Sequence, residues 1–252
     1  MSVVPASAGM PGALEGRVVL VVGASGGLGE AASLGCAEAG ASLVLLGRRV
    51  PKLNRLHDRL QKTGVAPALY PLDLEGATPD DHAELAARIE SGFGRLDGIL
   101  HVAAAFDGLT PLELTDPAAF ARALHVNLTA RWWLTQACLP LLRRAGDGSI
   151  VFAIDDPVRT AGAYWGGYGL AQAGLSALVG MLQAELGDAP VRVSGLLPPP
   201  MRTPLRAKAH VEAEDRVARS PVEVAAHCVA LLSPAGAPHR GQLWSPDAAL
   251  HA

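Results

Sequence analysis

A glycine-rich turn follows the first apolar run of the chain and limits what the chain can fold into. Val18–Val22 reads VVLVV, typical of a buried strand, and continues as Gly23-Ala-Ser-Gly-Gly27-Leu-Gly29 before a helical pattern begins. Glycine leaves room for the backbone to approach a pyrophosphate at a helix N-terminus. The sequence therefore predicts a dinucleotide-phosphate site here, and the alternative is a tight strand–helix turn that binds nothing. The residues predicted to line the site are Gly23, Ser25, Gly27, Leu28 and Gly29.

Short apolar runs alternate with helical patterns along the rest of the chain. This alternation predicts repeated βαβ units and therefore an α/β fold with a parallel sheet. A long fourth helix is expected from Asp116-Pro117 toward Leu142, and capping residues at Thr78 and Ser220 precede two other helices. The predicted strands cover residues 18–22, 42–46, 67–72, 98–103, 149–154, 191–197 and 241–244.

The length of 252 residues suits one domain of this class. Residues 1–15 lack the basic start and the long apolar run of a signal peptide and are expected to be a flexible leader, so the domain covers residues 16–252. The proline-rich and polar stretch at about 199–220 is expected to form a lid over the carboxyl edge of the sheet, where ligands bind in folds of this kind.

Composition excludes several kinds of partner. The formal net charge is -3 and only three residues are lysine, so we expect neither nucleic acid nor a membrane surface as a partner. The three cysteines, Cys36, Cys138 and Cys228, are far apart and form no CxxC pair. This spacing argues against disulfides and a metal site, and it is typical of a cytoplasmic protein.

No charged residue occurs from Thr160 to Ala184. A membrane span is possible on length alone. Because the stretch contains glycines, two glutamines and a serine, the favoured interpretation is a helix buried on two sides, against the sheet and against a partner subunit.

The Gly-x3-Gly-x-Gly spacing resembles that of the short-chain dehydrogenase/reductase family. The resemblance covers about residues 16–246 and is closest to the bacterial YciK-like branch, through DPAAF, LTQACLPLL, WGGY and MRTPLRA between residues 111 and 206. It implies a Rossmann-type doubly wound sheet of about seven strands in the order 3-2-1-4-5-6-7. The other matching segments are Leu72-Asp73-Leu74, Val126-Asn127, Tyr168 and Val191-Arg-Val with Pro198.

The resemblance also implies a nicotinamide cofactor. Asp73 would hold the adenine ring, although it also reads as an ordinary surface carboxylate. Gly47 stands where enzymes that use NAD usually carry an acidic residue, and Arg48 and Arg49 follow it. Two arginines favour a 2′-phosphate and hence NADP(H), whereas the alternative is a pair of solvated side chains. The remaining expected cofactor contacts are Leu74, Ala103, Ala104, Pro198 and Thr203.

The catalytic set of the family is incomplete in this chain. Family members use Ser, Tyr and Lys, and Tyr168 matches the tyrosine, but Gln172 stands at the lysine position and Asp155 at the serine position. An ammonium about 5 Å from a phenol favours phenolate by roughly 3 kcal/mol at an effective dielectric of about 20, or about two pKa units. Glutamine lacks that charge, and a carboxylate at 155 would raise the pKa of Tyr168 further. Alternatively, a protonated Asp155 would donate a hydrogen bond to a substrate carbonyl.

Other positions near the predicted site also bear on the comparison with the motifs of the family. The Asn-Asn-Ala-Gly of the family is His101-Val102-Ala103-Ala104 here, and His101 is expected to pack in or near the core. Asn127 would take part in the catalytic proton relay of the family, or it is simply an Asn that breaks a helix. Pro198-Pro199 replaces a Pro-Gly and is expected to stiffen the loop over the nicotinamide.

Three functional hypotheses follow. The first is an NADP(H)-dependent oxidoreductase of an unknown carbonyl or alcohol, slow or with Asp155 in a modified proton relay. The second is a non-catalytic relative that binds a nucleotide or a protein partner. The third is a membrane-associated subunit, based only on residues 160–184. By resemblance, the fourth and fifth helices would pair with their copies in a homodimer or homotetramer.

Overall fold

The protein forms one seven-stranded parallel sheet in the order β3-β2-β1-β4-β5-β6-β7. We analysed a computed structural model, which describes residues 11–210 and 217–247. The predicted fold class and strand order are confirmed. The strands are β1 (Val18–Val22), β2 (Ser42–Gly47), β3 (Ala68–Pro71), β4 (Gly98–His101), β5 (Gly148–Ala153), β6 (Val191–Leu196) and β7 (Leu243–Trp244).

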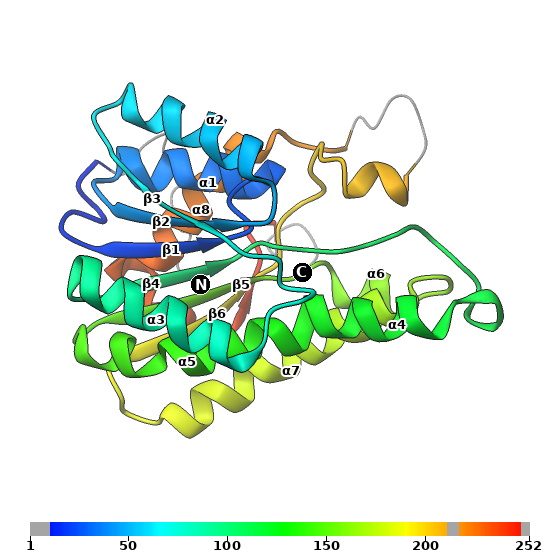
Figure 1. The fold of residues 1–252 in the computed structure, drawn as a ribbon. Coiled ribbons are helices and arrows are strands. Elements are labelled where there is room, and N and C mark those ends of the chain that lie inside the picture. The colour runs from blue at the N-terminus through cyan, green and yellow to red at the C-terminus, as the bar shows by residue number, and fades with distance from the viewer. Residues whose placement is uncertain (1–10, 211–216, 248–252) are drawn as a thin grey trace.

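Helices cover both faces of the sheet (Figure 1). On one face lie α1 (Gly27–Glu38), α2 (Val50–Gln61) and α8 (Pro221–Leu232), and their leucines, valines and alanines share a core with β1 and β2. On the other face lie α3 (Pro79–Phe93), α5 (Ala130–Arg144) and α7 (Gly166–Leu186), with a second core against β4, β5 and β6. The short elements are η1 (Leu112–Leu114), α4 (Pro117–Leu124), α6 (Pro157–Thr160), η3 (Arg206–Lys208) and η4 (Pro234–His239).

Two of the predicted helix starts are fixed by reciprocal hydrogen bonds. The Thr78 hydroxyl accepts from the backbone of Asp81 at the start of α3, and the Asp81 carboxylate accepts from the backbone of Thr78. Ser220 and Glu223 make the same exchange at the start of α8. Such caps contribute about 1 kcal/mol each, which explains why these starts are readable from the sequence.

The predicted fourth helix is not continuous, and this expectation is corrected. It divides into α4 and α5, and a π-helical turn at His125–Thr129 separates them. A π turn adds one residue to the helical register and is common at functional sites. The spacing of apolar residues still fits a helix on both sides of the turn, so the sequence pattern alone does not reveal it.

The leader prediction also needs correction where the structure describes it. Residues 11–16 form turns, and Leu14 is fully buried in the core beside α1 and donates its amide to Ala39. Residues 1–10 of the expected leader lie outside the described residues. An apolar side chain that can reach a core is ordered by burial even without regular secondary structure.

The uncharged stretch forms the connection after α6 and most of α7, which packs closely on α4 and on the π turn. A Cβ atom at Gly167 would lie 2.6 Å from the carbonyl oxygen of Phe120, and one at Gly174 would lie 2.8 Å from the Leu128 side chain. The glycines therefore permit close helix packing. Among the described residues, no helix combines the length and the apolar character that a membrane crossing requires.

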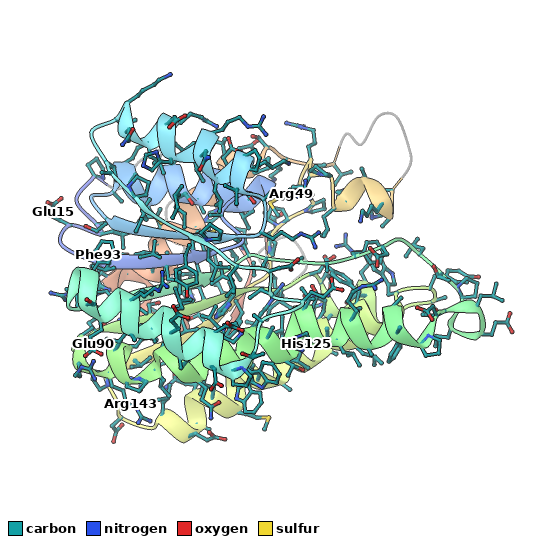
Figure 2. The ribbon with its side chains drawn as sticks, in the orientation of Figure 1. Glu15, Arg49, Glu90, Phe93, His125 and Arg143 are labelled. Atoms are coloured by element: carbon teal, nitrogen blue, oxygen red, sulfur yellow. The ribbon has the colours of Figure 1, made fainter. Side chains whose placement is uncertain are left out.

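The loops at the carboxyl edge of the sheet gather on one side of the molecule. Arg49 lies on that side in Figure 2, whereas Glu15, Phe93 and Glu90 lie at the opposite end. The segment after β6 crosses this edge and returns through a bridge that pairs Met201 with Arg219. The predicted lid is thus described over residues 199–210 and 217–220, and the rest of it lies outside the described residues.

Candidate active site

The glycine turn brings β1, α1 and the end of β4 into direct contact. Gly23 adopts a positive φ of 94°, and a Cβ atom there would lie 2.5 Å from the backbone nitrogen of Ala103. A Cβ atom at Gly29 would lie 2.1 Å from the carbonyl oxygen of Gly23. Both positions require glycine because backbone atoms occupy the space. Helix α1 begins at Gly27 with Gly26 as its N-cap and no side-chain cap, so its first amides suit an anionic phosphate.

A single cavity of about 410 Å³ extends from this turn along the carboxyl edge. The cavity is lined by fifteen of the seventeen residues predicted to form the site, and the two exceptions are Gly29 and Asn127. We call the part beyond β2 the β2 end, which is lined by Ser25, Gly47, Arg48, Arg49, Lys52, Asp73 and Leu74. We call the opposite part the tyrosine end, which is lined by Ala103, Ala104, Phe106, Arg131, Asp155, Arg159, Trp165, Tyr168, Gln172, Pro198 and Thr203.

The β2 end is rich in exposed cations. The guanidinium of Arg48 lies 3.7 Å from the carboxylate of Asp73, and both side chains are about half exposed. A Cβ atom at Gly47 would approach the Ser25 hydroxyl to 3.2 Å, so the end of β2 lies against the glycine turn. No carboxylate occupies position 47 and two arginines follow it, so this end presents guanidinium groups with which an anionic ligand could pair.

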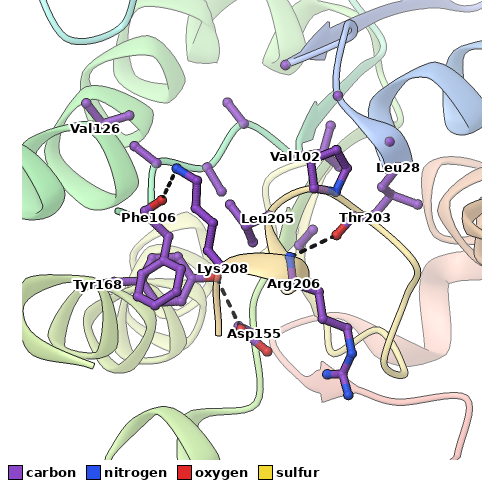
Figure 3. A pocket seen from close by; sticks show the side chains of 18 of the residues that line it. Leu28, Val102, Phe106, Val126, Asp155, Tyr168, Thr203, Leu205, Arg206 and Lys208 are labelled. Carbon is purple, nitrogen blue, oxygen red and sulfur yellow. Dashed lines mark hydrogen bonds between the residues drawn. The ribbon is translucent and has the colours of Figure 1, made fainter. Parts of the chain in front are cut away.

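Tyr168 and Asp155 meet at the tyrosine end (Figure 3). The Tyr168 hydroxyl donates a hydrogen bond of 3.2 Å to Oδ2 of Asp155, and the Arg159 guanidinium forms an ion pair with Oδ1. Both carboxylate oxygens of Asp155 are engaged by these contacts, and the alternative of a protonated Asp155 as hydrogen-bond donor stays a prediction. The phenol proton is directed at Asp155, so a substrate oxygen would have to displace that carboxylate to receive it.

Gln172 is buried and fixes the backbone of the same loop. Its Oε1 accepts a hydrogen bond of 2.9 Å from the Asp155 amide. The side chain therefore holds the loop after β5, and it carries no charge toward Tyr168.

The pKa of Tyr168 is raised well above its ordinary value. Burial is the largest cause, the negative charge of Asp155 adds to it, and the positive charge of Arg131 opposes both. The phenol thus stays protonated across neutral pH. A tyrosine in this state can donate a proton but is a poor base.

Asn127 lies below the cavity and is fully buried in the π turn. Its side-chain amide donates to the carbonyl oxygens of Ala105 and Ala123 at 2.7 and 2.8 Å, and its oxygen accepts from the Ala105 amide at 2.9 Å. These bonds occupy the side chain and connect the loop after β4 to the π turn. The proton-relay role of Asn127 remains a prediction.

His101 packs in the core, as expected. Its ring stacks on Phe152 with 4.6 Å between centroids, and its Nε2 lies 3.0 Å from the Thr135 hydroxyl. Burial, the charge of Arg131 and then that of His82 lower the pKa of His101 well below its ordinary value. It is a neutral structural residue rather than a base.

Several lining residues were missed by sequence reasoning. Phe106 and Trp165 form an aromatic wall with the predicted Tyr168, with centroid separations of 4.9 to 5.9 Å. Lys208 from the lid was also missed, and it donates to the Phe106 carbonyl at 2.5 Å. Arg131 was also missed, although it offers a signal. It is a charged residue between Ala130 and Leu134 on the apolar face of a helix, and such a charge is unusual.

Residues 17–214 match the family model of the short chain dehydrogenases. The chain belongs to the short-chain dehydrogenase family. The uncharacterized oxidoreductase YciK of Escherichia coli strain K12 is 33% identical over 212 residues, or 84% of either chain.

Solved structures of this family agree with the fold. A candidate short chain dehydrogenase from Pseudomonas syringae has 37% identity and a TM-score of 0.89, covering 95% of this chain and 98% of the other. A candidate family member from Escherichia coli CFT073, solved in complex with NADPH, has 31% identity and a TM-score of 0.89, covering 93% and 98%. The described part of the chain contains no group of His, Cys, Asp or Glu side chains suited to a metal ion.

Proposed function

We propose that this protein is an NADP(H)-dependent oxidoreductase that acts on a small carbonyl or alcohol. The continuous cavity carries the proposal, because it joins the glycine turn and the arginines of the β2 end to Tyr168. The turn fits a dinucleotide, since Cβ atoms at its glycines would fill the space that the backbone needs. When bound, such a cofactor would supply or accept hydride.

The tyrosine end favours the reductive direction. Tyr168 stays neutral and holds the proton that a reduced carbonyl oxygen needs, while Asp155 accepts its hydrogen bond until substrate arrives. The aromatic wall excludes water on one side of the phenol. Removing a proton from an alcohol would require phenolate, which this site disfavours.

We infer a preference for NADP(H) over NAD(H) from the β2 end. Arg48, Arg49 and Lys52 line it, and the solved relative in complex with NADPH supports the same cofactor. Both Arg48 and Asp73 would have to adjust for Arg48 to reach a 2′-phosphate, because they now face each other.

The second candidate function is a nucleotide-binding protein without turnover. It is favoured by one observation, the hydrogen bond from the Asp155 amide to Gln172, which commits the residue at the lysine position to a structural contact. Such a protein would keep the β2 end and the turn while losing hydride chemistry.

A spectrophotometric assay separates these candidates. NADPH is added with a panel of carbonyl compounds, and the loss of its absorbance is followed for the wild type and for Tyr168→Phe. Turnover that disappears in Tyr168→Phe supports the oxidoreductase. Thermal protection by NADPH without turnover of any compound supports the binding protein, and the absence of protection by either nicotinamide cofactor rejects both.

We also propose that α5 and α7 form the contact between subunits of a homodimer or homotetramer. Trp132 on α5 and Leu170 and Met181 on α7 are between 43% and 60% exposed. Large apolar side chains at neighbouring helices are typical of interfaces. Light scattering coupled to size exclusion measures the assembly, and a monomer at micromolar concentration rejects it.

A further inference from the structure

Arg131 is the bulkiest of the fully buried side chains in the described part of the chain. It lies on α5, directly after the π turn, and is 1% exposed. Nevertheless it lines the cavity at the tyrosine end. A guanidinium is rarely buried to this extent unless it is paired.

The guanidinium connects the carboxyl ends of two central strands. One terminal nitrogen donates to the carbonyl oxygen of Ala103 after β4, and the other donates to that of Ala153 at the end of β5, at 3.3 Å. The third nitrogen, Nε, is buried without a hydrogen-bond partner among the described residues. A charged side chain that lines the cavity thus has donor capacity that the described residues do not satisfy.

No carboxylate pairs with Arg131 within the described ranges, and the only ionisable group that raises its pKa is Tyr168. Burial lowers the pKa of Arg131 to about 10, so it stays charged at neutral pH. A buried cation without an opposite charge costs stability. Because two neutral carbonyl groups offset only part of that cost, a further electron-rich partner is implied.

Position 172 on α7 carries no charge, since Gln172 is neutral and bound to the Asp155 amide. Arg131 lines the same end of the cavity from α5, and its positive charge acts on Tyr168. The site therefore contains one buried cation, supplied by a different helix.

We propose that Arg131 is the cationic binding residue of the tyrosine end. Arg131 would hold the oxygen-rich nicotinamide half of the dinucleotide, and its charge would oppose the effect of the Asp155 charge on Tyr168. This inference rests on the proposed cofactor. It assigns Arg131 to the ribose and phosphate oxygens of that half, for which a guanidinium offers several donors.

Binding measurements with a whole cofactor and a fragment test the proposal. NADPH occupies both ends, whereas 2′,5′-ADP lacks the nicotinamide half. We expect Arg131→Met to weaken NADPH about tenfold or more and to change the affinity for 2′,5′-ADP by less than about twofold. Arg131→Lys should recover much of the NADPH affinity, because it keeps the charge.

Arg192→Met is the matched control. Arg192 is also buried and bonded to a backbone carbonyl, that of Ser233, but it pairs with Asp147 and does not line the cavity. We expect it to lower the melting temperature while leaving the ratio of the two affinities unchanged. An equal loss of both ligands in Arg131→Met, as in a general loosening of β4 and β5, overturns the proposal.

A second variant, which adds a cation at position 172, tests the proposal if Arg131→Met does not fold. We expect Gln172→Lys in the wild-type background to lower the melting temperature and to give no gain in NADPH affinity, because two cations would then share one site. A gain of about tenfold or more would overturn the proposal, since it would mean that this end lacked a cation. If the wild type binds neither NADPH nor 2′,5′-ADP, the proposed function itself fails.

Discussion

At the β2 end of the cavity the residues follow the pattern of the family, whereas at the tyrosine end two of the three catalytic side chains differ. The glycine turn that adjoins the β2 end depends mainly on backbone atoms, and a Cβ atom at Gly23 or Gly29 would collide with them. The tyrosine end depends on single side chains, which can be exchanged while the strands stay in place. The geometry that binds a dinucleotide therefore follows from the backbone of this fold, whereas proton transfer depends on individual side chains.

The largest expected effect comes from filling the turn. Gly29→Ala places a methyl group against the Gly23 carbonyl and should lower the free energy of unfolding by about 3 kcal/mol and abolish thermal protection by NADPH. Calorimetry with and without NADPH measures both. Gly92→Ala is the control, because Gly92 on α3 has open space around it and an added methyl should stabilise the helix by up to about 1 kcal/mol. Normal NADPH binding by a folded Gly29→Ala protein would contradict the role of the turn.

The next effect concerns the tyrosine end. Asp155→Ser removes the negative charge beside Tyr168, so the pKa of Tyr168 should fall and turnover of NADPH with carbonyl compounds should rise by about tenfold or more. The NADPH affinity should change little. Asp156→Ser is the control, because Asp156 caps α6 and does not line the cavity. A fall in turnover with binding intact would show instead that Asp155 takes part in the reaction.

A smaller effect is expected at the β2 end. Arg48→Ala should weaken NADPH about tenfold and leave NADH unchanged, since only the former carries a 2′-phosphate. Titration by fluorescence gives both affinities. Arg143→Ala, an exposed arginine of α5 that Figure 2 shows away from Arg49, should change neither. Equal weakening of both cofactors would mean that Arg48 contacts a shared part of them.

The smallest expected effect is a pH dependence of the stability that arises from the buried His101. The pKa of His101 is lowered by burial, so below about pH 6.5 the unfolded chain takes up a proton that the folded protein does not. Stability should therefore fall as pH falls, by up to about 1.4 kcal/mol per pH unit from this group. Urea unfolding between pH 5 and pH 7 should show a weaker slope for His101→Leu. An identical slope would mean that other groups cause the acid sensitivity.

Much of the molecule follows from local sequence patterns. The turn at residues 23–29 and the caps at Thr78 and Ser220 are predictable because each depends on neighbouring residues. The strand order was predicted from the resemblance to the family rather than from any local pattern. The substitutions at Asp155 and Gln172 are also visible in the sequence, because Tyr168 fixes their spacing. The π turn and the burial of Leu14 were not predicted, since neither changes the local pattern of apolar residues.

By itself, the sequence determined the parallel sheet, the phosphate turn and the identity of the residues at the catalytic positions, because short-range spacing specifies them. Only the tertiary structure decided which groups face Tyr168. Arg159 is bound to Asp155, and Arg131 reaches the site from another helix. Charges act through space, so their effect on a buried phenol depends on distances that no spacing along the chain contains.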